Sequence, residues 1–240
     1  MSKVMCRYET LDYLKEEYKK GTRSVISRYN DGEYLLMNNT DRVIANSTSG
    51  ILSDLLKKAI KIKGQFICVN YLKTHNIEKK DRWYEAQKYL IDQSKNELYG
   101  CSNYNVQDFC EESELISKYF IGNVLIVTGL DKETLDFFKD LQPKVSVYKT
   151  PMSNAVSEYE NIKKNLENIC NNYDTIIFSC GPLAKVLVAD LIDKCKTNLI
   201  DFGSVLNAIL DLTSMWTMSW TKDIDLQQKR NNFINKIKEI

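Results

Sequence analysis

Several features that mark particular classes of protein are scarce in this chain of 240 residues. No run approaches the roughly twenty apolar residues that are needed to span a bilayer, and the N-terminal segment lacks the apolar core of a signal peptide. The formal net charge is only +1, so the sequence lacks the basic footprint of a nucleic-acid-binding protein. We therefore expect a cytoplasmic protein with no transmembrane segment and no nucleic-acid partner.

Paired cysteines are also absent. The seven cysteines are an odd number and show no Cys-x-x-Cys spacing, which argues for reduced thiols and against a zinc site. The chain has neither a Walker loop nor a GxGxxG fingerprint, so the motifs support neither an ATPase nor a dinucleotide-binding protein. Linkers, repeats and low-complexity segments are missing as well. Residues 1–240 are therefore predicted to form a single domain.

What the chain does contain is an alternation of apolar strands and amphipathic helices. Strands that are apolar along their whole length, separated by helices, indicate a parallel sheet that is covered on both faces. The predicted fold class is therefore α/β, with a doubly wound and mostly parallel sheet. The predicted strands are 23–28, 65–71, 123–128, 144–149, 175–179 and 198–201. The predicted helices are 11–20, 49–61, 79–93, 132–141, 154–171 with Asn154 as a possible N-cap, 182–194, 205–212 and 223–240, and residues 96–112 are predicted as a loop followed by a helix.

Three polar clusters follow predicted strands, at 28–33, 179–185 and 201–204. Because ligands of doubly wound sheets bind beyond the carboxyl ends of the strands, these clusters are expected to converge on one crevice.

The first cluster contains two carboxylates, Asp31 and Glu33, at the end of a strand-like run. If Gly32 lets the backbone turn here, both acids can face one point in space. Mg²⁺ and Mn²⁺ favour oxygen ligands of this kind together with substrate phosphates, so Asp31 and Glu33 are the predicted metal ligands. Arg28 adds a planar cation that suits diphosphate oxygens. An ordinary solvated turn is the alternative interpretation.

The second cluster joins a buried strand to a helix. Gly181 allows the backbone to approach a ligand closely, and the N–H groups of the first helical turn attract phosphate. Lys185 lies about one turn further on and adds a cation. The candidate cofactor-binding residues here are Ser179, Cys180, Gly181, Pro182 and Lys185. A plain strand-to-helix turn would explain the same residues.

Asp201, in the third cluster, could bind a ribose hydroxyl, position the metal, act as a base on an acceptor hydroxyl, or simply cap a helix. The only histidine, His75, has no visible partner in the sequence. Trp216 and Trp220 could stack on a sugar ring, although packing in the core explains their spacing as well. The charged C-terminal helix is expected to dock onto the domain.

Taken together, these motifs resemble the GT-D-type glycosyltransferases, a Rossmann-like family with an Asp-x-Glu motif. The resemblance covers residues 23–205 in order and spacing. It is carried by Arg28-Tyr-Asn-Asp31-Gly-Glu33, Thr150-Pro151, Asn154-Ala155, Tyr159, Ser179-Cys-Gly181-Pro182-Leu-Ala184-Lys185-Val-Leu187, Asp190-Leu191 and Asp201-Phe-Gly203.

The resemblance implies a metal-dependent transfer of a sugar from a nucleotide-diphosphate donor, typically a UDP-hexose, to a glycan or glycoconjugate acceptor. Asp31 and Glu33 would work with Mn²⁺ or Mg²⁺, and Gly181 and Pro182 would flank the nucleotide. The chain departs from the family pattern at Ser204, where a histidine is expected, and at 215–220, where an aromatic-acidic segment is expected.

Two alternatives follow from these departures and from the Rossmann-like pattern. One is a catalytically degenerate domain that binds a nucleotide sugar or a partner in a glycan-assembly system. The other is a methyltransferase with a Rossmann-like sheet. The sequence does not support this alternative, because an acidic pair follows the first strand where a methyltransferase has a glycine-rich turn.

Overall fold

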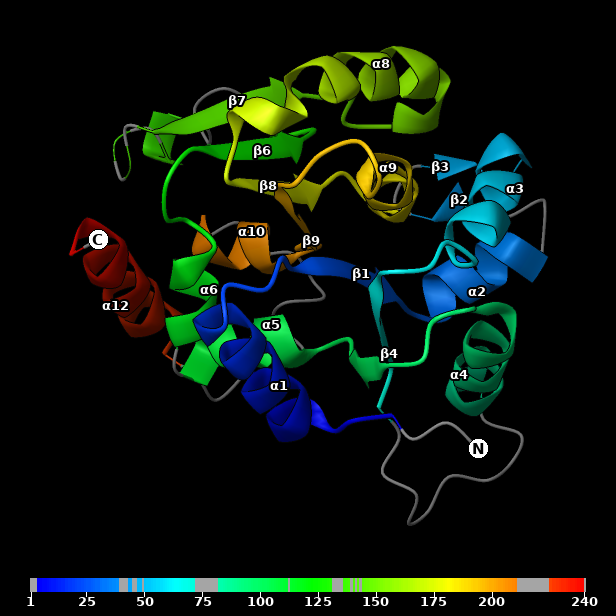
Figure 1. The fold of residues 1–240 in the computed structure, drawn as a ribbon, viewed down its shortest axis with the longest axis horizontal. Coiled ribbons are helices and arrows are strands. Elements are labelled where there is room, and N and C mark those ends of the chain that lie inside the picture. Colours follow the sequence, from blue (N-terminus) through cyan, green and yellow to red (C-terminus); the bar gives the residue numbers. More distant parts are fainter. Residues whose placement is uncertain are drawn as a thin grey trace.

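The computed structural model describes residues 4–38, 43–44, 47–48, 50–71, 82–111, 113–130, 136–138, 140, 142, 144–210 and 225–239. Seven of the described strands form one parallel sheet in the order β5-β4-β1-β9-β8-β6-β7 (Figure 1). They are β1 (Val25–Tyr29), β4 (Phe66–Val69), β5 (Tyr99–Cys101), β6 (Val124–Thr128), β7 (Val145–Lys149), β8 (Thr175–Ser179) and β9 (Asn198–Asp201). The predicted α/β class with a doubly wound sheet is confirmed.

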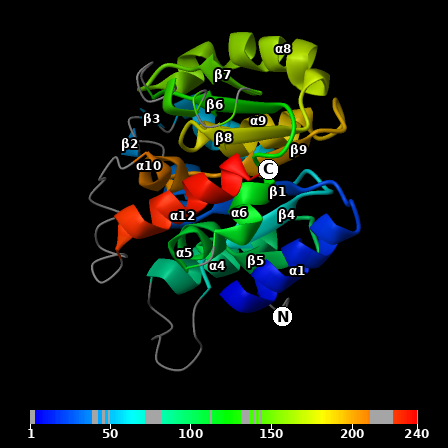
Figure 2. The same ribbon diagram turned by 90° about the vertical axis from the view of Figure 1, so that its left-hand side faces the viewer.

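Helices cover both faces of this sheet, as the apolar strands require. Every residue of β1, β4 and β6 is buried, so neither face of these strands meets water. One face packs against α2 (Asp31–Asn38), α3 (Gly50–Ala59), α4 (Arg82–Gln93), α8 (Tyr159–Ile169) and α9 (Leu183–Leu191). The other packs against α1 (Arg7–Lys19), α5 (Tyr104–Glu111), α6 (Glu114–Lys118), α10 (Val205–Ile209) and α12 (Leu226–Lys238) (Figure 2).

The remaining described elements are short. They are the antiparallel pair β2 (Val43–Ile44) and β3 (Ser47–Thr48) and the 3-10 helices η1 (Ala155–Glu158) and η2 (Cys170–Asn172). Asn154, the possible N-cap, precedes η1 with a left-handed backbone and makes no capping hydrogen bond with its side chain.

The C-terminal helix α12 docks onto the second face, as its apolar residues predict. Phe233 is fully buried, and its ring meets Phe109 of α5 and Phe120 edge to face. Aromatic pairs in this orientation add to the free energy gained from burial.

The chain leaves neighbouring strands of the sheet in opposite directions. It continues from β1 into α2 on the first face, and from the adjacent β9 into α10 on the second face. Neighbouring strands whose connections diverge in this way open a crevice beyond their carboxyl ends, where α/β proteins bind ligands. The fold thus places the ligand-binding edge where Arg28–Glu33 and 201–204 meet.

One strand of the sheet was not predicted. Residues 99–101 form the edge strand β5 in a region predicted as a loop followed by a helix. The strand has three residues and contains Gly100, which has low β-propensity, so its pattern is weak. Gly100 is nevertheless suited to its place, because a Cβ there would lie 2.7 Å from the ring of Phe66.

Along the part of the chain that the structure describes, no helix combines the length and the apolar character that crossing a membrane requires.

Candidate functional site

The acidic pair lies in a helix, not in the predicted turn. Strand β1 ends at Tyr29, and Asp31 already belongs to α2. The Asn30 N–H donates to Glu33 Oε2 at 2.9 Å, as in a helix capping box. Gly32 has no positive φ, so the backbone freedom that we expected there is not used. Because side chains two residues apart on a helix do not share a face, the two acids are not aimed at one point by their spacing.

Glu33 instead meets two of the other predicted residues in a buried ion cluster. Lys185 Nζ lies 3.0 Å from Glu33 Oε1 and 3.1 Å from Asp201 Oδ2. The three side chains are 8%, 10% and 0% exposed, respectively. They come from α9, α2 and β9, so two ion pairs join the three polar clusters at the carboxyl edge of the sheet. The predicted convergence of the clusters is therefore observed.

The charges in this cluster stabilise one another. Burial alone would lower the pKa of Lys185, but the negative charges of Asp201 and Glu33 outweigh burial and raise the pKa. Lys185 is therefore an ammonium at neutral pH. Asp201 Oδ2 also accepts a hydrogen bond from the backbone N–H of Arg28 at 3.0 Å, which fixes the carboxylate between two donors.

The guanidinium of Arg28, which we expected to face a diphosphate, bonds to backbone carbonyls of the protein. It is buried and donates to the carbonyl oxygens of Ser102 at 2.6 Å and Phe202 at 3.0 Å. It thus ties the ends of β5 and β9 together. A role for Arg28 at a diphosphate stays a prediction.

The strand-to-helix turn at Gly181 has the backbone shape that the sequence predicts. Gly181 has a φ of +66°, which favours glycine, and Pro182 is the N-cap residue of α9. The Ser179 hydroxyl donates to the carbonyl oxygen of Gly203 at 2.8 Å, so the loops after β8 and β9 are joined directly. Ser179 therefore holds the edge together, whether or not it also contacts a ligand.

Cys180, next to this turn, is a half-buried thiol. Burial, with the nearby charge of Asp201, raises the pKa of Cys180 to about 12. We predict that iodoacetamide at pH 8 alkylates Cys180 at least about a hundredfold more slowly than glutathione, because thiolate is the reactive form. Peptide mass spectrometry over a time course measures this rate, with Cys180→Ala as the blank. A rate equal to that of glutathione would contradict the prediction.

Two asparagines at the same edge were missed by the sequence analysis. Asn30 follows β1 and Asn70 follows the adjacent β4. Asn70 Oδ1 accepts a hydrogen bond from Ser102 Oγ at 2.9 Å. Among the described residues, Asn30 Oδ1, Asn70 Nδ2 and Asp201 Oδ1 are buried and have no hydrogen-bond partner. The signal in the sequence was an asparagine directly after the last residue of β1 and of β4.

Two further residues that carry the family resemblance connect helices. The Tyr159 hydroxyl donates to Asp190 Oδ2 at 2.8 Å, which joins α8 to α9. His75, Trp216 and Trp220 lie outside the described residues, so their predicted roles are not placed.

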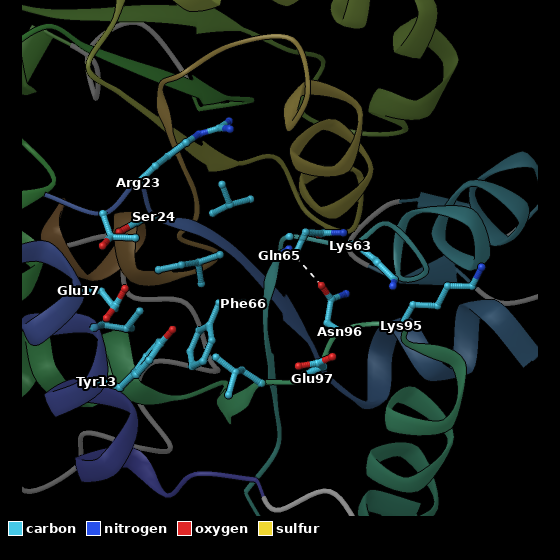
Figure 3. A pocket seen from close by; sticks show the side chains of 16 residues that line it. Tyr13, Glu17, Arg23, Ser24, Lys63, Gln65, Phe66, Lys95, Asn96 and Glu97 are labelled. Carbon is cyan, nitrogen blue, oxygen red and sulfur yellow. Dashed lines mark hydrogen bonds between the residues drawn. The ribbon is translucent and has the colours of Figure 1, made fainter. Parts of the chain in front are cut away.

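The described structure also has a cavity of about 380 Å³ at the opposite, amino-terminal edge of the sheet. Figure 3 shows that residues preceding β1, β4 and β5 line it, including Arg23, Gln65 and Asn96. These polar groups bond within the protein: Asn96 Oδ1 accepts from the Gln65 N–H, and Arg23 donates to the carbonyl oxygen of Thr197. None of the predicted site residues lines this cavity.

Comparison with solved structures matches nearly the whole chain. One match is described as a highly conserved domain of unknown function, number 1792, with "a distinct glycosyltransferase fold"; the TM-score is 0.63 at 20% identity, over 92% of this chain and 82% of the other. Another is described as a new glycosyltransferase of the same domain type from Streptococcus sanguinis, with a TM-score of 0.64 at 18% identity, over 92% and 86% of the two chains.

The chain has a glycosyltransferase fold. The structural resemblance to the GT-D-type domains is thereby confirmed. No family model and no curated protein matches the sequence. For a glycosyltransferase fold with a parallel sheet, the edge that holds Glu33, Lys185 and Asp201 is the expected ligand-binding edge.

Proposed function

We propose that this chain is a glycosyltransferase that moves a sugar from a nucleotide-diphosphate donor to a glycan or glycoconjugate acceptor. UDP-hexose is the leading donor class. The observation that carries the proposal is the gathering of buried charged and unpaired polar groups at the carboxyl ends of β4, β1 and β9 in a glycosyltransferase fold. Buried polar atoms usually have partners in folded proteins. The described structure has several without one, and the three that gather at this edge favour a polar ligand here.

The residues at this edge supply what a nucleotide diphosphate needs. The ammonium of Lys185 offsets the negative charge of the two carboxylates at this edge, and the backbone N–H groups at the start of α9 offer donors for phosphate oxygens. Asn30 and Asn70 have an unpaired acceptor and an unpaired donor, which suit the hydroxyl and amide groups of a nucleoside. Backbone N–H donors of this kind stabilise the diphosphate as it leaves the sugar.

The base for the acceptor hydroxyl was predicted to be Asp201. This carboxylate is fully buried and its Oδ2 is held by Lys185 and by the Arg28 N–H. Of the two carboxylate oxygens of Asp201, Oδ1 is the one that has no hydrogen-bond partner among the described residues, so an acceptor hydroxyl would have to reach that atom. We therefore propose Asp201 first as the residue that positions Lys185.

The donor set suits a divalent metal only in part. Asp31, in the first turn of α2, is partly exposed and carries oxygens of the kind that such a metal prefers. Both oxygens of Glu33 accept from Lys185 or Asn30. No three His, Cys, Asp or Glu side chains within the described ranges are grouped to hold a metal. Mg²⁺ or Mn²⁺ would therefore be held by Asp31 together with the donor's phosphates. When bound, it would neutralise charge on the diphosphate.

The proposal is tested by calorimetry with UDP, UDP-hexoses and S-adenosylmethionine, each with Mn²⁺ or with chelator. We expect UDP and a UDP-hexose to bind, and Mn²⁺ to tighten UDP binding at least about tenfold, since a metal shared with phosphates adds charge to the site. Asp31→Asn should lose this gain, whereas Asp54→Asn, in an exposed position of α3, should keep it. Binding of S-adenosylmethionine alone would refute the proposal. Donor binding without slow hydrolysis would favour the degenerate binding domain.

A further inference from the structure

Lys185 is placed where a lysine is costly. It is the third residue of α9 after the N-cap Pro182, and the N-terminus of a helix carries partial positive charge that disfavours a cation. Its side chain is also 8% exposed, so the ammonium has lost most of its water. Within the described part of the chain, the two carboxylates that it contacts compensate for both effects.

Those carboxylates come from α2 and from the end of β9, and both contact the ammonium. Glu33 Oε1 lies 3.0 Å and Asp201 Oδ2 lies 3.1 Å from Lys185 Nζ. The second oxygen of Glu33 accepts from the Asn30 N–H, and Asp201 Oδ2 also accepts from the Arg28 N–H. A divalent cation bound by Glu33 and Asp201 would need the space that the ammonium fills.

We propose that Lys185 is the built-in cation of this site and takes the position between Glu33 and Asp201 that a metal would otherwise occupy. In this arrangement Glu33 is a positioning residue for Lys185 and not a metal ligand, although it belongs to the Asp-x-Glu motif. Of the two acids of the motif, Asp31 then remains as the candidate metal ligand. This inference deepens the proposed function and rests on it for the identity of the donor.

The test measures Mn²⁺ binding without any nucleotide, from the electron paramagnetic resonance signal of the free ion. Removing the ammonium while keeping both acids creates a pair of buried carboxylates without a cation. We therefore expect Lys185→Met to bind Mn²⁺ at least about tenfold more tightly than the unmodified chain, because metal affinity rises with the charge of the ligand set. Lys185→Arg retains the charge and should show no gain. Lys185→Met/Asp201→Asn should lose the gain.

Circular dichroism establishes that each variant is folded, and Lys185→Gln replaces Lys185→Met if the latter does not fold. A folded Lys185 variant without charge that binds Mn²⁺ no more tightly than the unmodified chain would overturn the inference. Where the unmodified chain binds Mn²⁺, Glu33→Gln should reduce the affinity less than Asp31→Asn does, because in this arrangement Asp31 and not Glu33 supplies a ligand oxygen. A loss as large as that of Asp31→Asn would also overturn it. Because no nucleotide is present, failure of the donor screen leaves this result unaffected.

Discussion

Asp201→Ala is expected to lower the free energy of unfolding by about 3–5 kcal/mol, because it leaves a buried ammonium with half of its compensation. Lys185 would retain Glu33 but lose the carboxylate at 3.1 Å. The backbone N–H of Arg28, which donates to the same carboxylate, would lose its acceptor in the interior. Both losses occur at a side chain that is fully buried, so water does not replace the missing partner.

Urea denaturation at pH 7, followed by circular dichroism, measures this change. Asp201→Asn should be less destabilising than Asp201→Ala, because the amide oxygen still accepts from Arg28. Asp193→Ala is the matched control at an exposed aspartate and should change stability by less than about 0.5 kcal/mol. A loss below about 1 kcal/mol in Asp201→Ala would mean that the ion cluster does not hold the three strand ends together.

Gly203→Ala is expected to lower the free energy of unfolding by about 3 kcal/mol, through backbone strain and a displaced arginine. Gly203 has a φ of +54°, which L side chains rarely adopt. A Cβ at this position would collide with Nη1 of Arg28, whose guanidinium donates to the carbonyl oxygens of Ser102 and Phe202. The substitution therefore disturbs the contact that ties β9 to β5.

Gly21→Ala separates the two causes. Gly21 also has a positive φ, +70°, but nothing lies within 4 Å of a Cβ there. This variant should show the backbone strain alone, about 1–2 kcal/mol. Chemical denaturation measures the free energy of unfolding of both variants. If Gly21→Ala and Gly203→Ala lost the same amount, displacing the guanidinium of Arg28 would cost no free energy. Its hydrogen bonds to the two carbonyls would then not stabilise this edge.

These two experiments concern the same edge of the sheet, yet they report on different cations. Lys185, in α9, joins α2 and β9 through carboxylates, and Arg28, in β1, bonds to the backbone carbonyls that follow β5 and β9. Either substitution is thus expected to reduce donor binding indirectly. For this reason stability has to be measured before any loss of binding is assigned to contact with a ligand.

Prediction from the sequence was most accurate where the local pattern is strong. Residues 198–201 and 175–179 were predicted as strands with the bounds that the structure has, because each is a short apolar run that ends in a polar or glycine-containing turn. The edge strand β5 was missed, since its three residues are held by pairing with β4 and not by their own propensity. The acidic pair was placed in a turn because Asp-Gly is a common turn sequence.

The sequence by itself determined the α/β class, the strands of the sheet apart from β5, and the polar residues that follow them, because apolar runs and strand ends are local properties of the chain. Only the tertiary structure decided which of those residues meet: that Glu33 holds Lys185, that Arg28 bonds to backbone carbonyls, and that Asp201 is fully buried. A carboxylate carries the same charge in any sequence, but its partner depends on which strands the folded sheet brings side by side.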